Sequence, residues 1–312
     1  MMKIIEKNEV FEKLEMKTCI DLMAQALKDL ASGKAYQPIR AMYKLPGNET
    51  FGFMPAYLGS DSVYGAKVVV ACPQNIGTPY PSHSGYVMIF DAQHGQVQGL
   101  ADAGAITQIR TGAVSAVATA LLARRDAHKL GIIGCGAQGR SHLEAISKVR
   151  DIKEVKVYDL RIEAANKYKT EMEAKFNIPI IICENVQEAV KDVDIVCTLT
   201  NAKQAYLRKE WISKGAHINA VGTFTPTTAE VTPELFALSK VYCDNYEACV
   251  KESGEYLSAL NAGLIKDDFI VGSIGDLLNN KVEGRINDEE ITMFDALGLA
   301  IEDVACGKYL CQ

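Results

Sequence analysis

Apolar positions recur with two different periods in the first part of the chain. Over residues 12–30 they follow helical spacing, which predicts an amphipathic helix. Over residues 41–91 they form short runs separated by Gly, Pro and Asn, which is typical of an antiparallel sheet. The small-residue stretch Gly112–Ala123 then predicts a buried helix, with Thr111 as its cap.

After residue 129 short apolar runs alternate with amphipathic segments. The predicted strands are LGIIG, EVKVYD, IIIC, DIVCTLT and HINAVG, and the predicted helices are QGRSHLEAISKV, residues 161–176 and VQEAVKD. Such alternation implies parallel strands joined by right-handed crossovers, with helices on both faces of the sheet. The last segment, about residues 288–312, has a helical pattern and is expected to pack back on the first domain.

Length, charge and cysteine usage narrow the class of protein. At 312 residues, and with about 150 residues per domain, the chain is expected to form two domains. The net charge of −6 argues against nucleic acid or a membrane surface as the main partner, and no stretch approaches the ~18 apolar residues of a membrane span. The nine cysteines include no C-x-x-C pair, so we expect free thiols in a cytoplasmic setting and no metal site.

A glycine-rich turn follows the first strand of the alternating region. Gly134, Gly136 and Gly139 match G-x-G-x-x-G, with an apolar strand before them and a helix after them. The first glycine permits the tight turn, the second lets the backbone approach a pyrophosphate, and the third allows close packing of helix and strand. The context predicts a dinucleotide site, although a glycine turn in an α/β domain that binds no nucleotide is the alternative.

An acidic residue ends the next predicted strand. Asp159 lies 25 residues after Gly134, where a carboxylate would accept hydrogen bonds from the adenosine ribose. This favours NAD, because a 2′-phosphate would be repelled. Arg161 would offset that repulsion, so NADP stays open.

Three cations stand out by their context in the first domain. Lys67 lies inside an apolar strand, where an unpaired ammonium would be costly, and Arg40 and Arg110 precede predicted elements. Together they could hold a substrate carboxylate, for which arginine supplies a planar pair of donors. The alternative is that each is an ordinary surface or edge charge. None of the five histidines has other metal-ligating residues near it in the sequence at the spacing of a metal site.

Taken together, these segments resemble the ornithine cyclodeaminase/mu-crystallin family over nearly the whole chain. The motifs are FGFMPAY, YGAKVV, QIRTGAVSAVAT, GIIGCGAQG, VDIVCTLT, HINAVG and EGRINDEEITMFDALGLAIED. The resemblance implies an α/β protein, with a Rossmann NAD(P)-binding domain at 113–289 and an α+β domain at 1–112 with 290–312. The latter binds the substrate and forms a homodimer.

The resemblance also implies roles for single residues. Arg40, Lys67 and Arg110 match positions that bind the substrate carboxylate, and Ser82 matches a hydroxyl near the nicotinamide. The implied cofactor contacts are Gly134, Gly136, Ala137, Gln138, Gly139, Asp159, Arg161, and Thr200 and Val221 at strand ends.

Two residues depart from the family pattern. Phe224 stands where ornithine cyclodeaminase carries an aspartate that assists proton transfer, and Ala296 replaces a common serine. A phenyl ring cannot act as a base, so the expected function is an NAD(P)-dependent oxidoreductase acting on the C–N bond of a small amino or imino acid. Lys67 would act as the proton partner or as a fixed charge, with Asp102 a second candidate for the proton. The alternatives are a cyclodeaminase-type lyase using bound NAD, and a non-catalytic ligand-binding protein like mu-crystallin.

Overall fold

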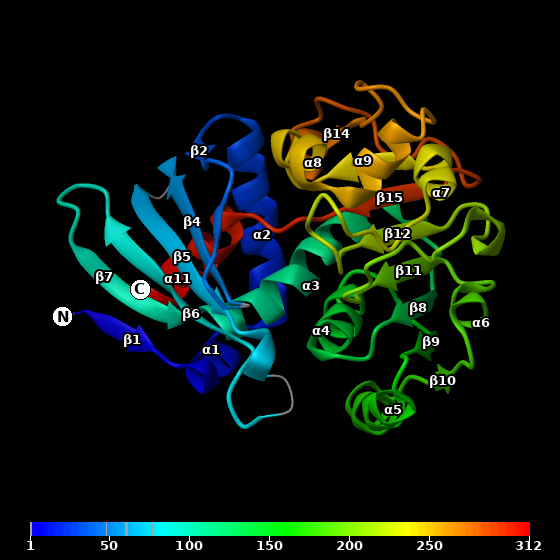
Figure 1. The fold of residues 1–312 in the computed structure, drawn as a ribbon, viewed down its shortest axis with the longest axis horizontal. Helices are drawn as coiled ribbons and strands as arrows, with labels where there is room; N and C mark the ends of the chain where they lie inside the picture. The colour runs from blue at the N-terminus through cyan, green and yellow to red at the C-terminus, as the bar shows by residue number, and fades with distance from the viewer. Residues whose placement is uncertain (1, 48, 60–61, 76–77) are drawn as a thin grey trace. The chain divides into compact units, whose positions relative to one another are not determined.

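The computed structural model describes residues 2–47, 49–59, 62–75 and 78–312. The chain divides into two compact units, Met1–Arg110 with Leu299–Gln312, and Thr111–Gly298. The first boundary falls inside helix α3 (Ala103–Leu122), the longest helix of the described chain (Figure 1). Each unit is built around its own sheet.

The first unit contains a seven-stranded sheet with the order β1-β7-β6-β5-β4-β2, to which β3 adds by pairing with β4. Its strands are β1 (Lys3–Ile5), β2 (Ala35–Tyr36), β3 (Ala41–Lys44), β4 (Thr50–Leu58), β5 (Val63–Ala71), β6 (His83–Asp91) and β7 (Val97–Asp102). The strands from β2 to β7 pair antiparallel, which the punctuated apolar runs predicted for β3 to β6. A 3₁₀ turn at Pro73–Asn75 lies between β5 and β6.

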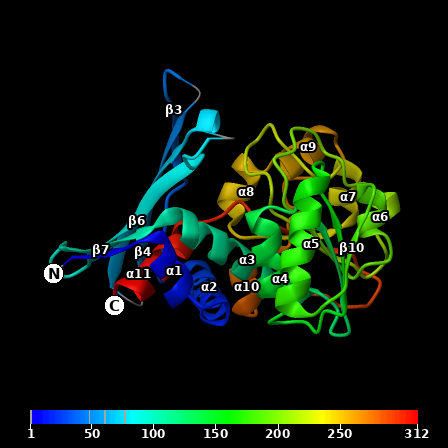
Figure 2. The same cartoon turned by 90° about the horizontal axis from the view of Figure 1, so that it is seen from below.

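Helices cover one face of this sheet. The helices are α1 (Lys7–Lys13), α2 (Met16–Ala31) and α11 (Ala300–Cys311). Figure 2 shows α11 lying against the sheet, where it packs on β4, β5, β6 and β7 and on α2. The approach is close, since a Cβ on Gly65 would lie 2.8 Å from the Val304 methyl carbons and one on Gly307 would lie 2.9 Å from Ile89 Cδ1. The predicted amphipathic helix is confirmed as α2, which buries Cys19, Met23 and Leu27.

The second unit contains an eight-stranded sheet whose strands all pair in parallel, in the order β10-β9-β8-β11-β12-β15-β13-β14. Its strands are β8 (Lys129–Ile133), β9 (Glu154–Tyr158), β10 (Ile180–Ile182), β11 (Ile195–Thr198), β12 (His217–Ala220), β13 (Lys240–Cys243), β14 (Gly272–Ser273) and β15 (Thr292–Asp295). The chain runs outward from β8 to β10 and then returns to the other side of β8 at β11. Ligands of such sheets bind at this switch point, beyond the carboxyl ends of the strands.

Both faces of the parallel sheet are buried, as expected for strands joined by helical crossovers. Alternate residues of β11 illustrate this, because Ile195 and Cys197 join the core with α4 and α5, whereas Val196 joins the core with α6 to α9. The helices are α4 (Ala137–Ile146), α5 (Ile162–Phe176), α6 (Val186–Val190), α7 (Pro233–Leu238), α8 (Tyr246–Glu252), α9 (Gly254–Asn261) and α10 (Ile274–Leu278), with a 3₁₀ turn at Lys209–Trp211.

Helix α3 differs from the prediction at its start. It begins at Ala103, eight residues before the predicted cap Thr111, because the Asp102 carboxylate accepts a hydrogen bond from Ala105 N at 2.7 Å and caps the helix there. At 20 residues α3 is long and apolar enough to cross a membrane by length and composition, which the shorter predicted helix was not. Of its most apolar window, 78% is buried inside the structure, as in the core helix of a folded domain.

The end of the chain also differs from the predicted continuous helix. Residues 292–295 form strand β15, which pairs with β12 and β13 in the parallel sheet, and only α11 is helical. The predicted boundary at residue 290 is therefore displaced, because the segment up to Gly298 is part of the second unit. Gly298 has a φ of 81°, a left-handed conformation that separates the strand from α11.

Candidate functional site

The glycine turn joins β8 to α4 at the switch point of the parallel sheet. Gly134 has a φ of 106°, and a Cβ there would lie 2.7 Å from the Leu199 carbonyl oxygen. A Cβ on Gly139 would lie 2.5 Å from the Gly134 carbonyl oxygen, so this glycine allows α4 to pack against the turn. The first and third glycines thus meet steric demands that only glycine satisfies.

The second glycine faces open space. A Cβ on Gly136 would meet no heavy atom within 4 Å, and both Gly136 and Ala137 are exposed. Gly136 precedes the first residue of α4, so the unpaired N–H groups of the first helical turn begin beside it. An open, glycine-lined helix N-terminus fits the pyrophosphate of a dinucleotide. Gln138, in the first turn of α4, is half-buried.

The acidic residue at the end of β9 contacts this turn. One oxygen of Asp159 accepts a hydrogen bond from Cys135 N at 2.8 Å, and the other accepts from Arg161 N at 2.9 Å. The Asp159 side chain is 13% exposed, whereas that of Arg161 is 77% exposed. Asp159 therefore holds the glycine turn against β9 and keeps an accessible edge, while Arg161 lies at the surface beside it.

The strand ends next to the glycine turn carry the two residues expected to support the nicotinamide. Thr200 follows β11, and its Cγ2 would lie 3.3 Å from a Cβ on Gly134. Val221 follows β12, and its N–H donates to the Thr198 carbonyl at 3.2 Å. The structure thus brings Thr200 against the turn and ties Val221 to the strand that precedes Thr200.

A buried carboxylate that the sequence analysis missed binds these strand ends. Glu230 is fully buried, and one of its oxygens accepts from Thr200 N at 2.7 Å, Thr200 Oγ1 at 2.6 Å and the Tyr206 hydroxyl at 2.8 Å. Its other oxygen accepts from Gly222 N at 2.8 Å. Burial raises the pKa of the Glu230 carboxyl, and the hydrogen bonds from Thr200 and Tyr206 oppose that rise.

Two further buried carboxyls, those of Glu255 and Asp295, belong to the same part of the second unit as Glu230. Glu255 accepts from Thr223 Oγ1 and from Glu230 N, both at 2.8 Å, and Asp295 accepts from Ser253 Oγ at 2.6 Å. Burial, followed by the negative charge of Asp295, raises the pKa of Glu255 to about 8. Burial likewise raises the pKa of Asp295 to about 6. We refer to Glu230, Glu255 and Asp295 as the acid trio.

The segment after β12 contains the position at which the family aspartate is replaced. Phe224 is 45% exposed and carries no ionisable group, so this position supplies no acid or base. Its neighbour Thr223 is buried, and its hydroxyl donates to Glu255.

In the first unit, Lys67 lies in a buried network of charges. Its ammonium group donates to Thr107 Oγ1 at 2.6 Å and to the two oxygens of Asp303 at 3.3 and 3.4 Å. Only 8% of the Lys67 side chain is exposed. Burial lowers the pKa of Lys67, the charge of Asp303 opposes this, and the charge of Arg110 reinforces it. An ammonium with a lowered pKa is suited to exchanging a proton.

Arg110 belongs to the same network. Its Nη1 donates to Glu302 at 2.6 Å and its Nε donates to Asp303 at 3.3 Å, with 6% of its side chain exposed. Lys67, Arg110, Glu302 and Asp303 therefore form a four-residue charge network whose formal charges sum to zero. The structure brings two of the three predicted cations together through a carboxylate that they share.

The remaining predicted substrate residues lie in the same unit. Arg40 is half-buried and directly precedes β3. Ser82 precedes β6, and its hydroxyl lies 3.2 Å from His83 Nδ1. Burial and the charge of Lys67 lower the pKa of His83, so the Ser82–His83 end of β6 lies within the electrostatic reach of Lys67.

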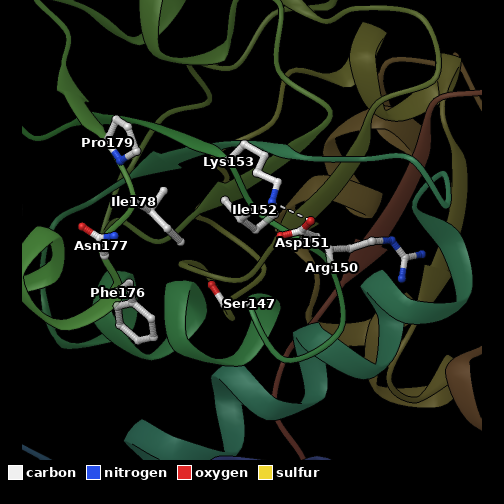
Figure 3. A pocket seen from close by; sticks show the side chains of 9 residues that line it. All are labelled: Ser147, Arg150, Asp151, Ile152, Lys153, Phe176, Asn177, Ile178 and Pro179. Atoms are coloured by element: carbon white, nitrogen blue, oxygen red, sulfur yellow. Dashed lines mark ion pairs between the residues drawn. The ribbon is translucent and has the colours of Figure 1, made fainter.

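The second unit also has a pocket beside the segments that precede β9 and β10, at the amino ends of these strands (Figure 3). Its volume is about 390 Å³ and an exposed ion pair, Asp151–Lys153, lies in its wall at 2.7 Å. Arg150, another lining residue, donates to the carbonyls of Thr119, Ala120 and Ala123 at the end of α3. The pocket therefore lies away from the glycine turn, which follows the carboxyl end of β8.

Among the described residues, no group of three or more His, Cys, Asp or Glu is placed to hold a metal ion.

Sequence reasoning missed the acidic partners of the cations and the acid trio. The partners left a signal, because Glu302 and Asp303 are adjacent acids in the otherwise apolar helix AIEDVAC. Asp102, considered as a second candidate for proton transfer, accepts a hydrogen bond from Ala105 N and caps α3. The acid trio left no comparable signal, since its hydroxyl and N–H partners lie 8 to 42 residues away along the chain.

Comparison with known proteins places the chain among C–N oxidoreductases. It is 36% identical to the Δ1-pyrroline-2-carboxylate reductase of Bacillus cereus over 311 residues, which are 99% of this chain and 95% of the relative. The solved Δ1-pyrroline-2-carboxylate reductase of Thermococcus litoralis, in complex with NADH and L-proline, matches with a TM-score of 0.96 and 33% identity, covering 99% of this chain and 96% of that one. An archaeal alanine dehydrogenase dimer with bound NAD matches with a TM-score of 0.94 and 31% identity, covering 99% and 95%.

The family model of the ornithine cyclodeaminase/mu-crystallin proteins matches residues 1–312. The resemblance found in the sequence motifs is thereby confirmed over the full length, and so is the α/β fold with its dinucleotide-type sheet. The chain belongs to the ornithine cyclodeaminase/mu-crystallin family.

Proposed function

We propose that this protein is a reductase of a small cyclic imino acid of the Δ1-pyrroline-2-carboxylate type. It is an NAD(P)-dependent oxidoreductase that acts on the C–N bond of a small amino or imino acid. One observation carries the choice of substrate: a solved relative that the chain matches over 99% of its length is a reductase of this kind in complex with NADH and L-proline.

In this proposal the two units have separate tasks. The first unit binds the substrate through its carboxylate, and the second binds the dinucleotide. Arg110 supplies the planar donors for the carboxylate, with Arg40 and Ser82 as further substrate contacts. Because Glu302 and Asp303 neutralise Lys67 and Arg110, recognition of the substrate carboxylate depends on the donor geometry of Arg110 rather than on an excess of positive charge in the network.

Reduction of the imine adds a hydride to its carbon and a proton to its nitrogen. When bound, the reduced nicotinamide supplies the hydride. Lys67 is the proposed proton partner, because burial lowers its pKa and Thr107 and Asp303 fix the position of its ammonium group. Fixing the imine by its carboxylate contributes to the rate by orientation, ~7–11 kcal/mol at the ideal limit.

The cofactor contacts are assigned to the open glycine turn and the strand ends. Gly134, Gly136, Ala137, Gln138 and Gly139 form the pyrophosphate cradle, with Thr200 and Val221 beneath the nicotinamide. Asp159 would accept from the adenosine ribose, which favours NAD, and the exposed Arg161 beside it provides a contact for a 2′-phosphate.

A direct assay tests the reaction. Purified protein is given NADH or NADPH with Δ1-pyrroline-2-carboxylate, with its six-membered homologue piperideine-2-carboxylate, or with pyruvate and ammonia. Stoichiometric loss of the reduced-nicotinamide absorbance with a cyclic imine supports the proposal, whereas turnover with pyruvate and ammonia alone would indicate an alanine dehydrogenase.

The two alternative functions, a cyclodeaminase and a ligand-binding protein, would give different results. Ornithine converted to proline with only catalytic NAD would identify a cyclodeaminase, which Phe224 disfavours because it supplies no base. Ligand binding in a thermal-shift screen without any turnover would identify a binding protein.

We also propose that the protein forms a homodimer through the open face of its first sheet. Helices cover one face, whereas the other carries apolar side chains that the cross-strand register aligns. The exposed fractions of Phe53, Tyr64 and Tyr86 are 40%, 48% and 36%, and the rings of Tyr57 and Tyr64 lie 4.9 Å apart. Such an apolar face is typical of an obligate interface, and the alanine dehydrogenase that the chain matches is a dimer.

The dimer is tested by analytical ultracentrifugation of the wild type and of Tyr64→Glu. The wild type is expected to sediment as a dimer and the variant as a monomer, because a charge in the centre of the face would be desolvated on association. A monomeric wild type at micromolar concentration would refute the proposed assembly. The nine free cysteines are in keeping with a reducing, cytoplasmic setting, which we propose as well.

A further inference from the structure

A single carboxylate joins two strand ends of the second unit. The oxygens of Glu230 accept from the backbone N–H groups of Thr200, after β11, and of Gly222, after β12. The Tyr206 hydroxyl and the Thr200 hydroxyl donate to it as well. Four hydrogen bonds from three residues thus meet on one side chain.

The approach of the two strand ends around this carboxylate is tight. A Cβ on Gly222 would lie 2.3 Å from the Thr200 carbonyl oxygen and 2.5 Å from Glu230 Oε2. On its other side, Thr200 lies against Gly134 of the glycine turn. A displacement of Glu230 would therefore move the ends of β11 and β12, and Thr200 would move relative to the glycine turn.

The arrangement is costly for stability, which indicates a role other than stability. Glu230 is fully buried, and the donors facing it are neutral hydroxyl and N–H groups. Its raised pKa shows that these donors do not fully compensate its burial. Costly buried ionisable groups concentrate at functional sites.

We propose that Glu230 is a positioning residue, which holds the ends of β11 and β12 in the arrangement that receives the nicotinamide half of the cofactor. The inference rests on the proposed function, since Thr200 and Val221 are assigned there to the nicotinamide. The adenosine half depends on Asp159 and the glycine turn, and Glu230 has no role in binding that half.

Glu230→Gln tests the hydrogen bonds of the carboxylate without changing the size of the side chain. A carboxamide has one accepting oxygen and one donating NH₂ group. In either orientation the NH₂ group faces one of the two backbone N–H donors, so the link between the two strand ends is lost. Tyr206→Phe is a milder second variant, because it removes one donor and leaves both backbone bonds.

Two probes separate the halves of the cofactor. Dissociation constants are measured by titration calorimetry for NADH and for ADP-ribose, which lacks the nicotinamide. Glu230→Gln is expected to weaken NADH binding about 10-fold and to leave ADP-ribose binding within about 2-fold, as expected for loss of hydrogen bonds to a buried charged group. Tyr206→Phe is expected to shift NADH alone, by about 2–3-fold. If Glu230→Gln does not fold, Tyr206→Phe decides the outcome.

The matched control is Asp194→Asn. The Asp194 carboxylate accepts from the backbone N–H groups of His128 and Lys129 at 2.9 Å, at the amino ends of the strands. This variant is expected to lower the unfolding temperature and to leave both dissociation constants unchanged. An equal change for both probes in folded Glu230→Gln, or no change, overturns the inference. A wild type that binds neither probe overturns the proposed function as well.

Discussion

The buried acidic side chains of the two units have different partners. In the first, Glu302 and Asp303 lie against two cations, Lys67 and Arg110, and the charges cancel. In the second, the acid trio is held by hydroxyl, thiol and N–H donors, for example Ser253 Oγ and Cys249 Sγ on Asp295. The pKa of every member of the trio is raised, and burial is the main cause in each case.

The difference determines how each group responds when it is disturbed. A charge that loses its partner in the first unit stays buried and uncompensated, which is expensive. A carboxyl of the acid trio can instead take up a proton and become neutral. The charge network is therefore expected to respond most to the loss of one partner, and the acid trio to respond most to a change of pH.

The largest expected effect follows from removing a cation of the charge network. Arg110→Met leaves Glu302 without the guanidinium that donates to it, and is expected to lower the free energy of unfolding by about 3–5 kcal/mol. Urea denaturation measures the change. The double variant Arg110→Met with Glu302→Gln should regain part of the loss, since it removes the uncompensated charge. Arg161→Met, at an exposed position, is the control. An equally unstable double variant would contradict charge balance as the cause.

The next effect concerns the shape of the cation. Arg110→Lys keeps the positive charge but loses the planar fork, and an amine cannot serve Glu302, Asp303 and a substrate carboxylate with the same geometry. We expect kcat/KM for the imine to fall about 100-fold, as for a small misplacement of a bound substrate. Steady-state kinetics under saturating NADH check this. Retention of full kcat/KM would show that Arg110 acts only as a structural charge.

A smaller effect is expected at the end of β9. Asp159→Asn keeps an oxygen that can accept from Cys135 N or Arg161 N, but loses the charge that faces the ribose. NADH binding should weaken about 10-fold, while discrimination against NADPH decreases. Dissociation constants for both cofactors, measured by fluorescence, give the ratio. Arg161→Ala is the matched variant and should act on NADPH alone, so a shift for NADH there would argue against the assigned roles.

The smallest effect sharpens the contrast in pH response. The pKa of Glu255 is about 8 in the folded state and near its ordinary value of 4.5 when unfolded, so the folded state binds the proton more tightly. Stability from this group is complete below about pH 4.5 and is lost as the pH rises towards 8. In Glu255→Gln the fall in unfolding temperature between pH 5 and 8 should be smaller, by roughly 2–4 °C for each kcal/mol of stability that the titration of Glu255 removes. Identical pH profiles for variant and wild type would show that Glu255 does not titrate in this range.

Much of the fold followed from periodicity, and the exceptions have local causes. Strands β3 to β6 and helices α2, α4 and α5 were predicted from the pattern of apolar and polar positions, whereas β1, β2 and β7 of the first sheet were not predicted. The end of the chain was misassigned because the residues next to Gly298, from Ala296 to Ile301, are apolar, so the break at Gly298 left no polar interruption. The start of α3 was misplaced although Asp102, which caps it, stands directly before a run of small residues.

The candidate site was predictable only where chemistry was local. The glycine turn and Asp159 are short motifs with a fixed mechanism, and Lys67 was conspicuous in an apolar strand. Its partner Asp303 lies 236 residues away, and Glu230 gathers donors from loops 8 to 30 residues distant. Contacts of this kind depend on how strands are ordered in the sheet, which no short pattern in the sequence encodes.

The split composition of the first unit has a consequence for synthesis. Leu299–Gln312 emerges from the ribosome only after all of Thr111–Gly298, so the second unit can complete its core before the first receives α11. Until then the first sheet lacks the helix that Gly65 and Gly307 allow to pack so closely, and Lys67 and Arg110 lack the acids that neutralise them. Until α11 emerges, the apolar face that it later covers is exposed, and exposed apolar surface of this kind favours aggregation of a nascent chain.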